Sequence, residues 1–185
     1  MISGIDSWLV DPILIYDSLG EGGYRMHIRE MEDKDNAVMA KIIKDSLESL
    51  GLDIPGTAYF DPELSRLSQF YQGETNASYF VAVNEADNVI GGVGIAPFDE
   101  ANGVCELQKL YVIPEEQGKG LAKKLLKKAL DFAQTHYRYC YLETSTELVA
   151  ATGLYLALGF HKLEQPLGNS GHNAMDTWLM KELND

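Results

Sequence analysis

The stretch that most constrains the fold of this chain is Leu107-Gln-Lys-Leu-Tyr-Val-Ile-Pro-Glu-Glu-Gln-Gly-Lys-Gly-Leu-Ala-Lys-Lys-Leu-Leu126. Apolar and aromatic residues from Glu106 to Val112 predict a strand, which Pro114 ends because proline cannot donate a ladder hydrogen bond. A helix is expected to begin near Gly118, with its apolar residues on one face: Leu121, Ala122, Leu125, Leu126, Ala129, Leu130 and Ala133. The sequence therefore predicts a buried strand, a short turn and an amphipathic helix in succession.

Two glycines punctuate the turn before this helix. Gly118 and Gly120 carry no Cβ, and the N–H groups of a first helical turn have no partner within the helix. Those donors and the positive end of the helix dipole make a site for a phosphate or pyrophosphate. We therefore expect an anion-binding turn here.

Two well-known phosphate-binding motifs do not fit this turn. A P-loop requires lysine after its last glycine, whereas Gly120 is followed by Leu121. A dinucleotide fingerprint requires a third glycine, where the chain has Lys123. Glu143 lies near the distance expected of a ribose-binding acid, but Ile113 to Gln117 separate the strand from the first glycine by more than a Rossmann turn allows.

A third pattern fits. Gln117-Gly-Lys-Gly-Leu-Ala122 matches the signature Q/R-x-x-G-x-G/A and resembles that of the GCN5-related N-acetyltransferase (GNAT) superfamily. A second motif, Gly153-Leu-Tyr-Leu-Ala-Leu-Gly-Phe160, is similar to the family's L-Y-x-x-x-G-F, in which a helix ends at glycine and runs into a strand. Gly159 suits the residue just after a helix end.

The resemblance implies an α/β fold with a mixed, mostly antiparallel central sheet, helices on both faces and splayed central strands. The splayed pair is expected near Leu110–Val112 and Tyr139–Leu142. We expect one domain from residue 25 to 185, since this length suffices for a single core, and an N-terminal extension over residues 1–24.

Sequence patterns also predict the remaining elements. A first strand is expected at Met26–Met31, and a helix capped by Asp33 or Asp35 should continue to Leu50 on the apolar residues Val38, Met39, Ile42, Ile43 and Leu47. A second helix is expected from Pro62 to Tyr71, because proline suits a first helical position. Further strands are expected at Ser78–Asn84, Val89–Ala96, Tyr139–Thr144 and Ala174–Leu183.

The resemblance implies that the ligand is acetyl-CoA, used as a cosubstrate, and that no metal takes part. The pantetheine arm would lie between the splayed strands, bonded by the backbone of Leu110 and Val112, and the glycine turn would hold the pyrophosphate. The expected cofactor-binding residues are Leu110, Tyr111, Val112, Gln117, Gly118, Lys119, Gly120, Leu121 and Ala122. The lysines of the helix, at 119, 123, 124, 127 and 128, either meet the other phosphate of CoA or form a solvated face.

Two residues are expected to carry the chemistry, in which acetyl would pass directly from the thioester to an amine. Glu106 matches the carboxylate that serves as base in the histone-acetylating branch of the family, and burial would have to raise its pKa, or a water relay the proton. Tyr155 would protonate the leaving thiolate of CoA. One departure is Leu148, where many members have an asparagine.

The acceptor is not identified by the sequence and could be a small amine or a peptide. Tyr59 and Phe60 are candidates for lining the acceptor site, and the alternative is that they pack in the core. A formal net charge of −13 argues against nucleic acid as a partner and favours a cationic acceptor. Because the family often dimerises, the resemblance leaves a homodimer open.

The expected location is the cytoplasm. Cys105 and Cys140 show neither metal spacing nor disulfide density, as in proteins of a reducing compartment. The apolar run Trp8–Tyr16 is interrupted and too short to span a membrane, and no signal peptide is evident. A further hypothesis is that translation starts at Met26, because Gly20-Glu-Gly-Gly23 just upstream can be encoded by a ribosome-binding sequence.

Two other classes of function remain open. One is a non-catalytic acetyl-CoA sensor or interaction module with the same fold, against which the presence of Glu106 and Tyr155 argues. The other is a Rossmann oxidoreductase, which would bind NAD and not CoA. The residues favour the enzyme over the sensor, and the sensor over the oxidoreductase.

Overall fold

A computed structural model describes residues 26–168 and 170–183. The expected N-terminal extension, with the run Trp8–Tyr16, lies outside the described residues. Seven strands in the described chain form one sheet in the order β1-β2-β3-β4-β5-β7-β6, in which only β4 and β5 are parallel neighbours. The strands are β1 Met26–Glu30, β2 Ser78–Asn84, β3 Val89–Asp99, β4 Val104–Val112, β5 Tyr139–Thr144, β6 His161–Lys162 and β7 Thr177–Glu182. This confirms the predicted mixed, mostly antiparallel sheet.

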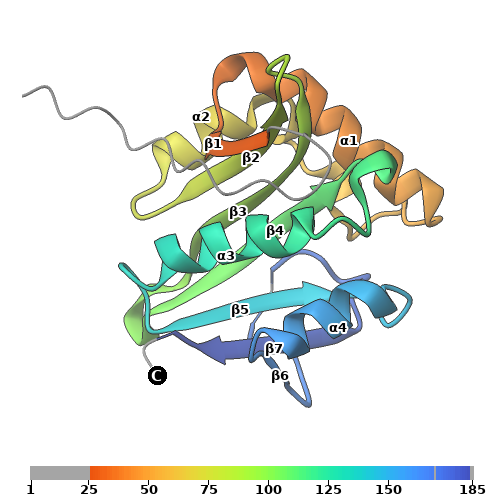
Figure 1. Cartoon of the computed structure of the whole chain (residues 1–185). Coiled ribbons are helices and arrows are strands. Elements are labelled where there is room, and N and C mark those ends of the chain that lie inside the picture. Colours follow the sequence, from red (N-terminus) through yellow and green to blue (C-terminus); the bar gives the residue numbers. More distant parts are fainter. Residues whose placement is uncertain (1–25, 169, 184–185) are drawn as a thin grey trace, which may run out of the picture.

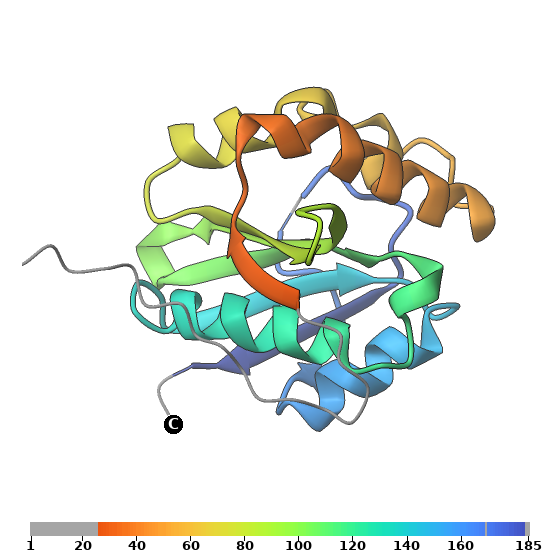
Figure 2. The same cartoon turned by 45° about the horizontal axis from the view of Figure 1, so that its top comes forward.

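Helices cover both faces of the sheet. Figures 1 and 2 show α1 (Asn36–Ser49) and α2 (Leu67–Gly73) on one face and α3 (Leu121–Ala133) and α4 (Val149–Ala157) on the other. A core of buried apolar side chains lies under each pair of helices. The predicted inner face of α3 is confirmed, since Leu121, Leu125 and Leu126 are buried and its lysines are exposed. Short 3-10 turns join the elements: η1 Asp33–Asp35, η2 Ala58–Phe60, η3 Leu64–Arg66, η4 Glu100–Asn102 and η5 Pro114–Glu116.

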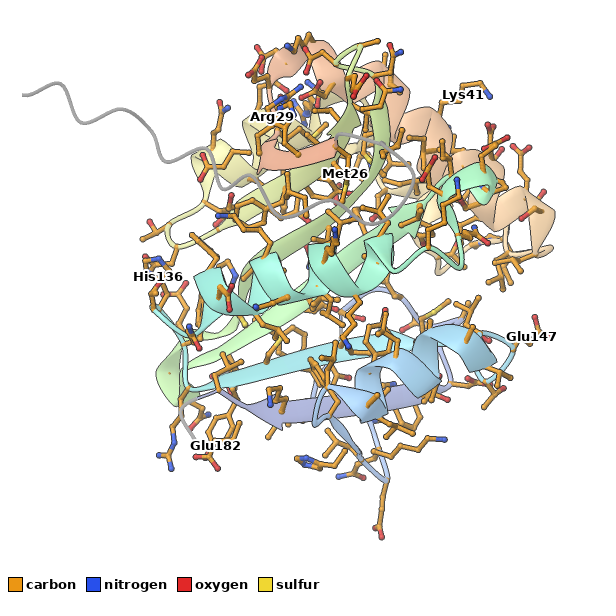
Figure 3. All side chains as sticks on the ribbon, in the orientation of Figure 1. Met26, Arg29, Lys41, His136, Glu147 and Glu182 are labelled. Atoms are coloured by element: carbon orange, nitrogen blue, oxygen red, sulfur yellow. The ribbon has the colours of Figure 1, made fainter. Side chains whose placement is uncertain are left out.

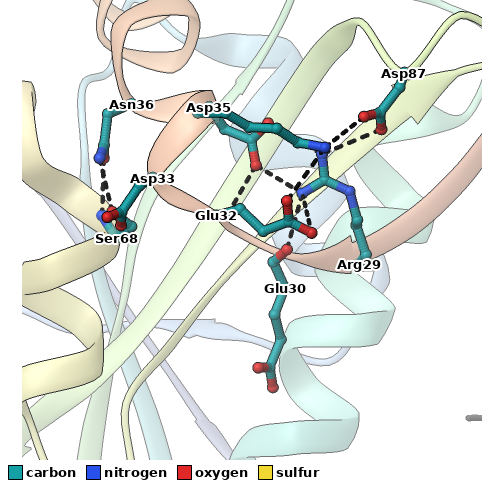
Figure 4. A network of polar contacts seen from close by, with 9 residues as sticks. Arg29, Glu30, Glu32, Asp33, Asp35, Asn36, Ser68 and Asp87 are labelled. Atoms are coloured by element: carbon teal, nitrogen blue, oxygen red, sulfur yellow. Dashed lines mark hydrogen bonds and ion pairs between the residues drawn. The ribbon is translucent and has the colours of Figure 1, made fainter.

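An ion-pair network fixes the junction between β1 and α1 (Figure 4). The guanidinium of Arg29 donates to both carboxylate oxygens of Asp35, at 2.6 and 3.0 Å, and to Asp87 at 3.2 Å. Asp35 also accepts a hydrogen bond from the backbone N–H of Glu32 at 2.8 Å. The carboxylate of Asp35 therefore belongs to the capping box of η1, and although Asp35 is the residue before α1, its side chain does not make the helix-capping hydrogen bond expected from the sequence.

Three details of the predicted helices are wrong. The helix expected from Pro62 begins as η3 and becomes α-helical only at Leu67, because residues 61–63 form a turn whose carboxylates pair with Lys109. Val38 is 45% exposed on the outer side of α1 rather than in the core. The helix expected near Gly118 begins three residues later, since Gly120 precedes Leu121 with a φ of +82° that no right-handed helix contains.

A β-bulge interrupts β4. Gly92 pairs with Tyr111 and Gly94 with Gln108, so Lys109 and Leu110 together lie opposite the single residue Val93. Lys109 has a φ of +51°, in the left-handed region that non-glycine residues rarely adopt. As a result, Leu110 packs against the core under α3 and α4, while Gln108 and Lys109 both make contacts on the α1 and α2 side. No residue pattern in the sequence indicates this bulge.

The bulge is held by a buried hydrogen bond from Tyr79 of β2. Tyr79 Oη donates to the carbonyl oxygen of Lys109 at 2.8 Å. We expect Tyr79→Phe to lower the free energy of unfolding by about 1–3 kcal/mol, because the buried carbonyl loses its partner. Urea unfolding measures the effect, with Tyr139→Phe as control, since no described residue hydrogen-bonds that hydroxyl. Equal stability of the Tyr79→Phe variant and the wild type would show that this bond does not hold the bulge.

Candidate active site

Strands β4 and β5 part at the centre of the sheet. They are paired at Val104–Tyr139, Cys105–Cys140 and Glu106–Tyr141, and not beyond, although both strands continue. The splayed central strands predicted from the sequence are therefore confirmed, but their place on β5 is not. The strands part after Glu106 and Tyr141, so Tyr139–Tyr141, expected within the splay, are paired with β4. The ends of β4 and β5 and the beginnings of α3 and α4 meet at one edge of the sheet (Figure 1). Glu147 marks this edge in Figure 3, and His136 and Glu182 mark the opposite one.

The backbone of β4 faces the opening between the strands. Ile113 N–H donates to the carbonyl oxygen of Ile90 on β3 at 3.0 Å. Since backbone groups alternate along a strand, the N–H and C=O groups of Val112 point the other way, toward β5. The carbonyl oxygen of Val112 accepts a hydrogen bond from Gln117 Nε2 at 3.0 Å, which ties the glycine turn to the strand. The backbone of Val112 therefore faces the opening, and the bonding of an extended amide arm by Leu110 and Val112 stays a prediction.

The glycine turn presents an exposed backbone. Gly118 and Gly120 have φ values of +73° and +82°, and a Cβ added to either would meet no atom within 4 Å. The first helical hydrogen bond of α3 runs from Lys124 N–H to the carbonyl oxygen of Gly120, at 3.2 Å. The N–H groups of Leu121, Ala122 and Lys123 precede that bond and have no acceptor within the helix. This is the arrangement that binds an anion at a helix beginning.

Glu106 is buried at the point where the two strands separate. It is 5% exposed and accepts a hydrogen bond from Gln108 Nε2 at 2.6 Å, and Gln108 Oε1 in turn accepts one from Tyr71 Oη at 2.8 Å. Burial raises the pKa of Glu106, and the hydrogen bond from Gln108 only partly offsets this effect. The alternative of a carboxylate exposed at a strand start is wrong, and the environment that a base would need is present.

Tyr155 approaches from the other face of the sheet, on α4. Its ring is 6% exposed and packs edge-on against Phe160, with 5.9 Å between the centroids. Burial raises its pKa, so the hydroxyl keeps its proton at neutral pH. Burial also raises the pKa of Tyr111 in β4, with a further contribution from nearby Tyr155. Among the described residues none hydrogen-bonds the Tyr155 hydroxyl.

A second polar cluster, which sequence reasoning missed, lies beside Glu106 on the α1 and α2 face. The ammonium of Lys109, whose side chain is only 3% exposed, lies 2.7 Å from Asp61 Oδ2 and 3.4 Å from Glu63 Oε1. His172 Nε2 lies 3.3 Å from Asp61 Oδ1. Burial would raise the pKa of Asp61, but its contacts with His172 and Lys109 outweigh burial and lower it.

The segment between β6 and β7 carries His172 and folds over β5. Ser170 Oγ donates to Glu143 Oε2 at 2.7 Å and accepts the backbone N–H of His172 at 3.1 Å. The other carboxylate oxygen of Glu143 accepts a hydrogen bond from Tyr141 Oη at 2.8 Å. A hollow of about 140 Å³ opens here, with lining residues that include Glu143, Ser170, His172 and Trp178.

Tyr59 and Phe60, the residues expected to wall the acceptor site, make other contacts. Tyr59 Oη donates to Glu48 on α1 at 2.6 Å, and its ring meets Phe60 edge-on at 5.0 Å between centroids. Phe60 is 58% exposed. The structure instead brings the next residue, Asp61, into the polar cluster. Leu148, at the position where an asparagine is common, precedes α4 and gives it no side-chain cap.

Comparison with known proteins identifies sequence relatives along most of the chain. A family model described as "Acetyltransferase (GNAT) family" matches residues 44–160. The uncharacterized N-acetyltransferase YjgM of Escherichia coli K12 is 38% identical over 159 residues, which cover 84% of this chain and 94% of that protein. The N-acetylaspartate synthetase of Xenopus tropicalis is 36% identical over 99 residues, which cover 53% of this chain and 36% of that protein.

Solved structures share the fold at low sequence identity. That of yncA from Salmonella typhimurium, with its cofactor acetyl-CoA, has a TM-score of 0.68 at 22% identity and covers 87% of this chain and 95% of that one. The spermidine N-acetyltransferase of Vibrio cholerae, in complex with CoA and spermine, has a TM-score of 0.62 at 22% identity and covers 85% of this chain and 95% of that one.

Proposed function

Because this chain belongs to the GNAT family of acetyltransferases, we propose that it moves the acetyl group of acetyl-CoA directly to an amine acceptor within a ternary complex. The position of Glu106 is the main support for this proposal. Glu106 is buried at the last paired position of β4 and β5, beyond which the strands part toward the glycine turn. The proposed base for the amine and the proposed backbone cradle for CoA would therefore border the same opening.

The residues present fit acetyl-CoA, which would supply the thioester. The N–H groups of Leu121 and Ala122, with the glycine turn from Gln117 to Gly120, would hold the pyrophosphate. The backbone of Leu110 and Val112 would bond the pantetheine amides, with Tyr111 between them. Lysines on the exposed side of α3 would meet the remaining phosphate.

Two residues of the chain would transfer protons in this reaction, Glu106 as acceptor and Tyr155 as donor. An amine with a pKa near 10.4 is neutral in only about one molecule in two thousand at pH 7, so a proton acceptor is needed before attack. Glu106 would take that proton, directly or through a water. As the C–N bond forms and the C–S bond breaks, Tyr155 would give its hydroxyl proton to the leaving thiolate and would regain one, through solvent, from the nitrogen of the new amide.

A thiol-release assay with acetyl-CoA and a panel of amines tests this function. Amine-dependent release of CoA, together with the acetylated amine in the mass spectrum, is the expected result. If calorimetry shows CoA binding while no amine in the panel is acetylated, the alternative of a sensor or interaction module with this fold is correct instead.

We further propose that the acceptor is a cation. Four carboxylates, those of Glu106, Glu143, Asp61 and Glu63, would border the acceptor side, where the described residues place one buried ammonium, that of Lys109. Such a surplus of negative groups attracts a protonated amine. A polyamine-like substrate accords with the name of the Vibrio cholerae protein, although that of the Xenopus tropicalis relative points to an amino acid.

The acceptor's charge can be tested with matched compounds. We predict that 1,4-diaminobutane is acetylated with a kcat/KM at least about tenfold above that of 4-aminobutanoate, since a carboxylate would face like charges. Aspartate serves as a second acidic substrate. Acetylation of aspartate with no activity on any diamine would reject a cationic acceptor.

The cytoplasm is the proposed location. No helix within residues 26–168 and 170–183 has both the length and the apolar character needed to cross a lipid bilayer. Cys105 and Cys140 are buried as free thiols, as a reducing compartment would keep them. We also propose that residues 25–185 act as one domain and that the enzyme is a homodimer, which analytical ultracentrifugation tests.

A further inference from the structure

His172 has the surroundings of a basic nitrogen rather than of a purely structural side chain. Its Nε2 lies 3.3 and 3.4 Å from the two carboxylate oxygens of Asp61. Asp61 is kept ionised by Lys109, whose ammonium is 2.7 Å away and buried. An ionised carboxylate accepts hydrogen bonds only, so the Nε2 of His172 carries the hydrogen, and in the neutral ring the lone pair is on Nδ1.

The bulge in β4 creates this arrangement. In a regular strand the side chains of Gln108 and Lys109 would point to opposite faces. The left-handed backbone at Lys109 lets both reach the α1 and α2 side, where Gln108 contacts Glu106 and Lys109 contacts Asp61. One irregular residue therefore supports the surroundings of both Glu106 and His172.

The segment before β7 holds the imidazole on the side of the sheet where Glu106 lies. Glu106 pairs with Tyr141, so the two side chains share a face, and Glu143, two residues on, shares it too. Ser170 binds Glu143 and caps the N–H of His172. His172 and Glu143 line the same hollow.

We propose that His172, positioned by Asp61 and Lys109, acts with Glu106 as a two-residue proton acceptor for the attacking amine. This inference rests on the proposed function. The ammonium form of the acceptor gives one proton to His172 Nδ1 or to Glu106, and the neutral amine then attacks the thioester carbonyl. The thiolate takes its proton from Tyr155, and the second proton that the nitrogen loses as the C–N bond forms restores the Tyr155 hydroxyl through solvent. The first proton leaves His172 or Glu106 for solvent after the product, so protons and charges balance.

The two groups influence each other's protonation. The hydrogen bond to Asp61 raises the pKa of His172 against the effect of burial, with Lys109 lowering it and Glu106 raising it. Burial raises the pKa of Glu106; Gln108, His172 and Lys109 lower it, whereas Glu143 raises it. Glu63 faces Lys109 from the other side of the cluster. The acidic limb of the pH–rate profile therefore belongs to the pair rather than to either residue.

The deciding experiment measures the pKa of His172 and the rate in the same variants. NMR titration should give the wild-type imidazole a pKa above about 6.5, and Asp61→Asn should lower it because the ionised partner is lost. In Asp61→Asn the acidic limb of kcat/KM, which the pair sets, should move to lower pH, the direction in which the imidazole pKa moves. His172→Gln should lower kcat/KM by about 10–100-fold with the Kd for CoA unchanged. His161→Gln, on exposed β6, is the matched control and should behave as the wild type.

The possible results distinguish a failure of the proposal for His172 from a failure of the proposed acetyltransferase function. If the wild type acetylates amines but His172→Gln is fully active and the limb does not move in Asp61→Asn, His172 is not part of the base. An imidazole pKa that is unchanged by Asp61→Asn overturns the inference without any rate measurement. If the wild type acetylates no amine, the proposed function fails and the inference fails with it.

Discussion

Tyr155→Phe is expected to lower kcat by about 10²–10⁴-fold while the Kd for CoA stays within error of the wild type. The substitution keeps the buried ring and its contact with Phe160 and removes only the hydroxyl. The thiolate would then leave without a positioned acid. Because burial raises the pKa of Tyr155, the hydroxyl is protonated throughout the neutral range and its loss should be felt at every pH there.

Single-turnover kinetics and calorimetry together measure this effect. Tyr139→Phe is the control, because Tyr139 lies at the opposite end of β5 from the site edge and should retain full activity. A Tyr155→Phe enzyme that keeps the wild-type kcat, with chemistry shown to limit the rate, would assign the acid role to another residue or to solvent.

Gly120→Glu is expected to weaken CoA binding about a hundredfold or more, which corresponds to several kcal/mol. A Cβ at this position points into open space next to the N–H groups that begin α3. The carboxylate would therefore occupy the place proposed for the pyrophosphate and repel it. The φ of +82° adds backbone strain for any residue with a side chain.

Two further variants separate charge from strain. Gly120→Gln has the same size without the charge and should lose less affinity. Gly51→Glu introduces the same residue at another left-handed glycine with no atom near its Cβ, so it should cost stability and not CoA affinity. Unchanged calorimetric affinity in a folded Gly120→Glu protein would show that the anion site is assigned wrongly.

What the sequence predicted well was local in the chain. The strand that ends before Pro114, the glycine turn and the inner face of α3 follow from spacing within a few residues, and each was found. The parting of β4 and β5 is not local, and it was anticipated only through the resemblance that the motifs around Gly120 and Tyr155 carry. The burial of Glu106 follows from that same long-range arrangement.

What the sequence could not show depends on contacts between distant residues. His172 and Asp61 are 111 positions apart, and neither lies in a recognisable motif. A left-handed Lys109 is not signalled by residue type, since glycine or asparagine is usual there. The helix expected from Pro62 failed for the same reason, because ion pairs to Lys109 hold Asp61 and Glu63 in a turn. The polar cluster thus appears only when the fold is assembled.

We propose that acetyl passes directly from CoA to an amine at this site. Rapid-quench mass spectrometry tests it most directly, by mixing enzyme with acetyl-CoA alone and then with a diamine. We expect unmodified protein in the first mixture, and in the second acetylated diamine formed in step with free CoA. Accumulation of an acetyl-enzyme before the amine is added, or bound CoA with no acetylated amine at any time, would contradict it.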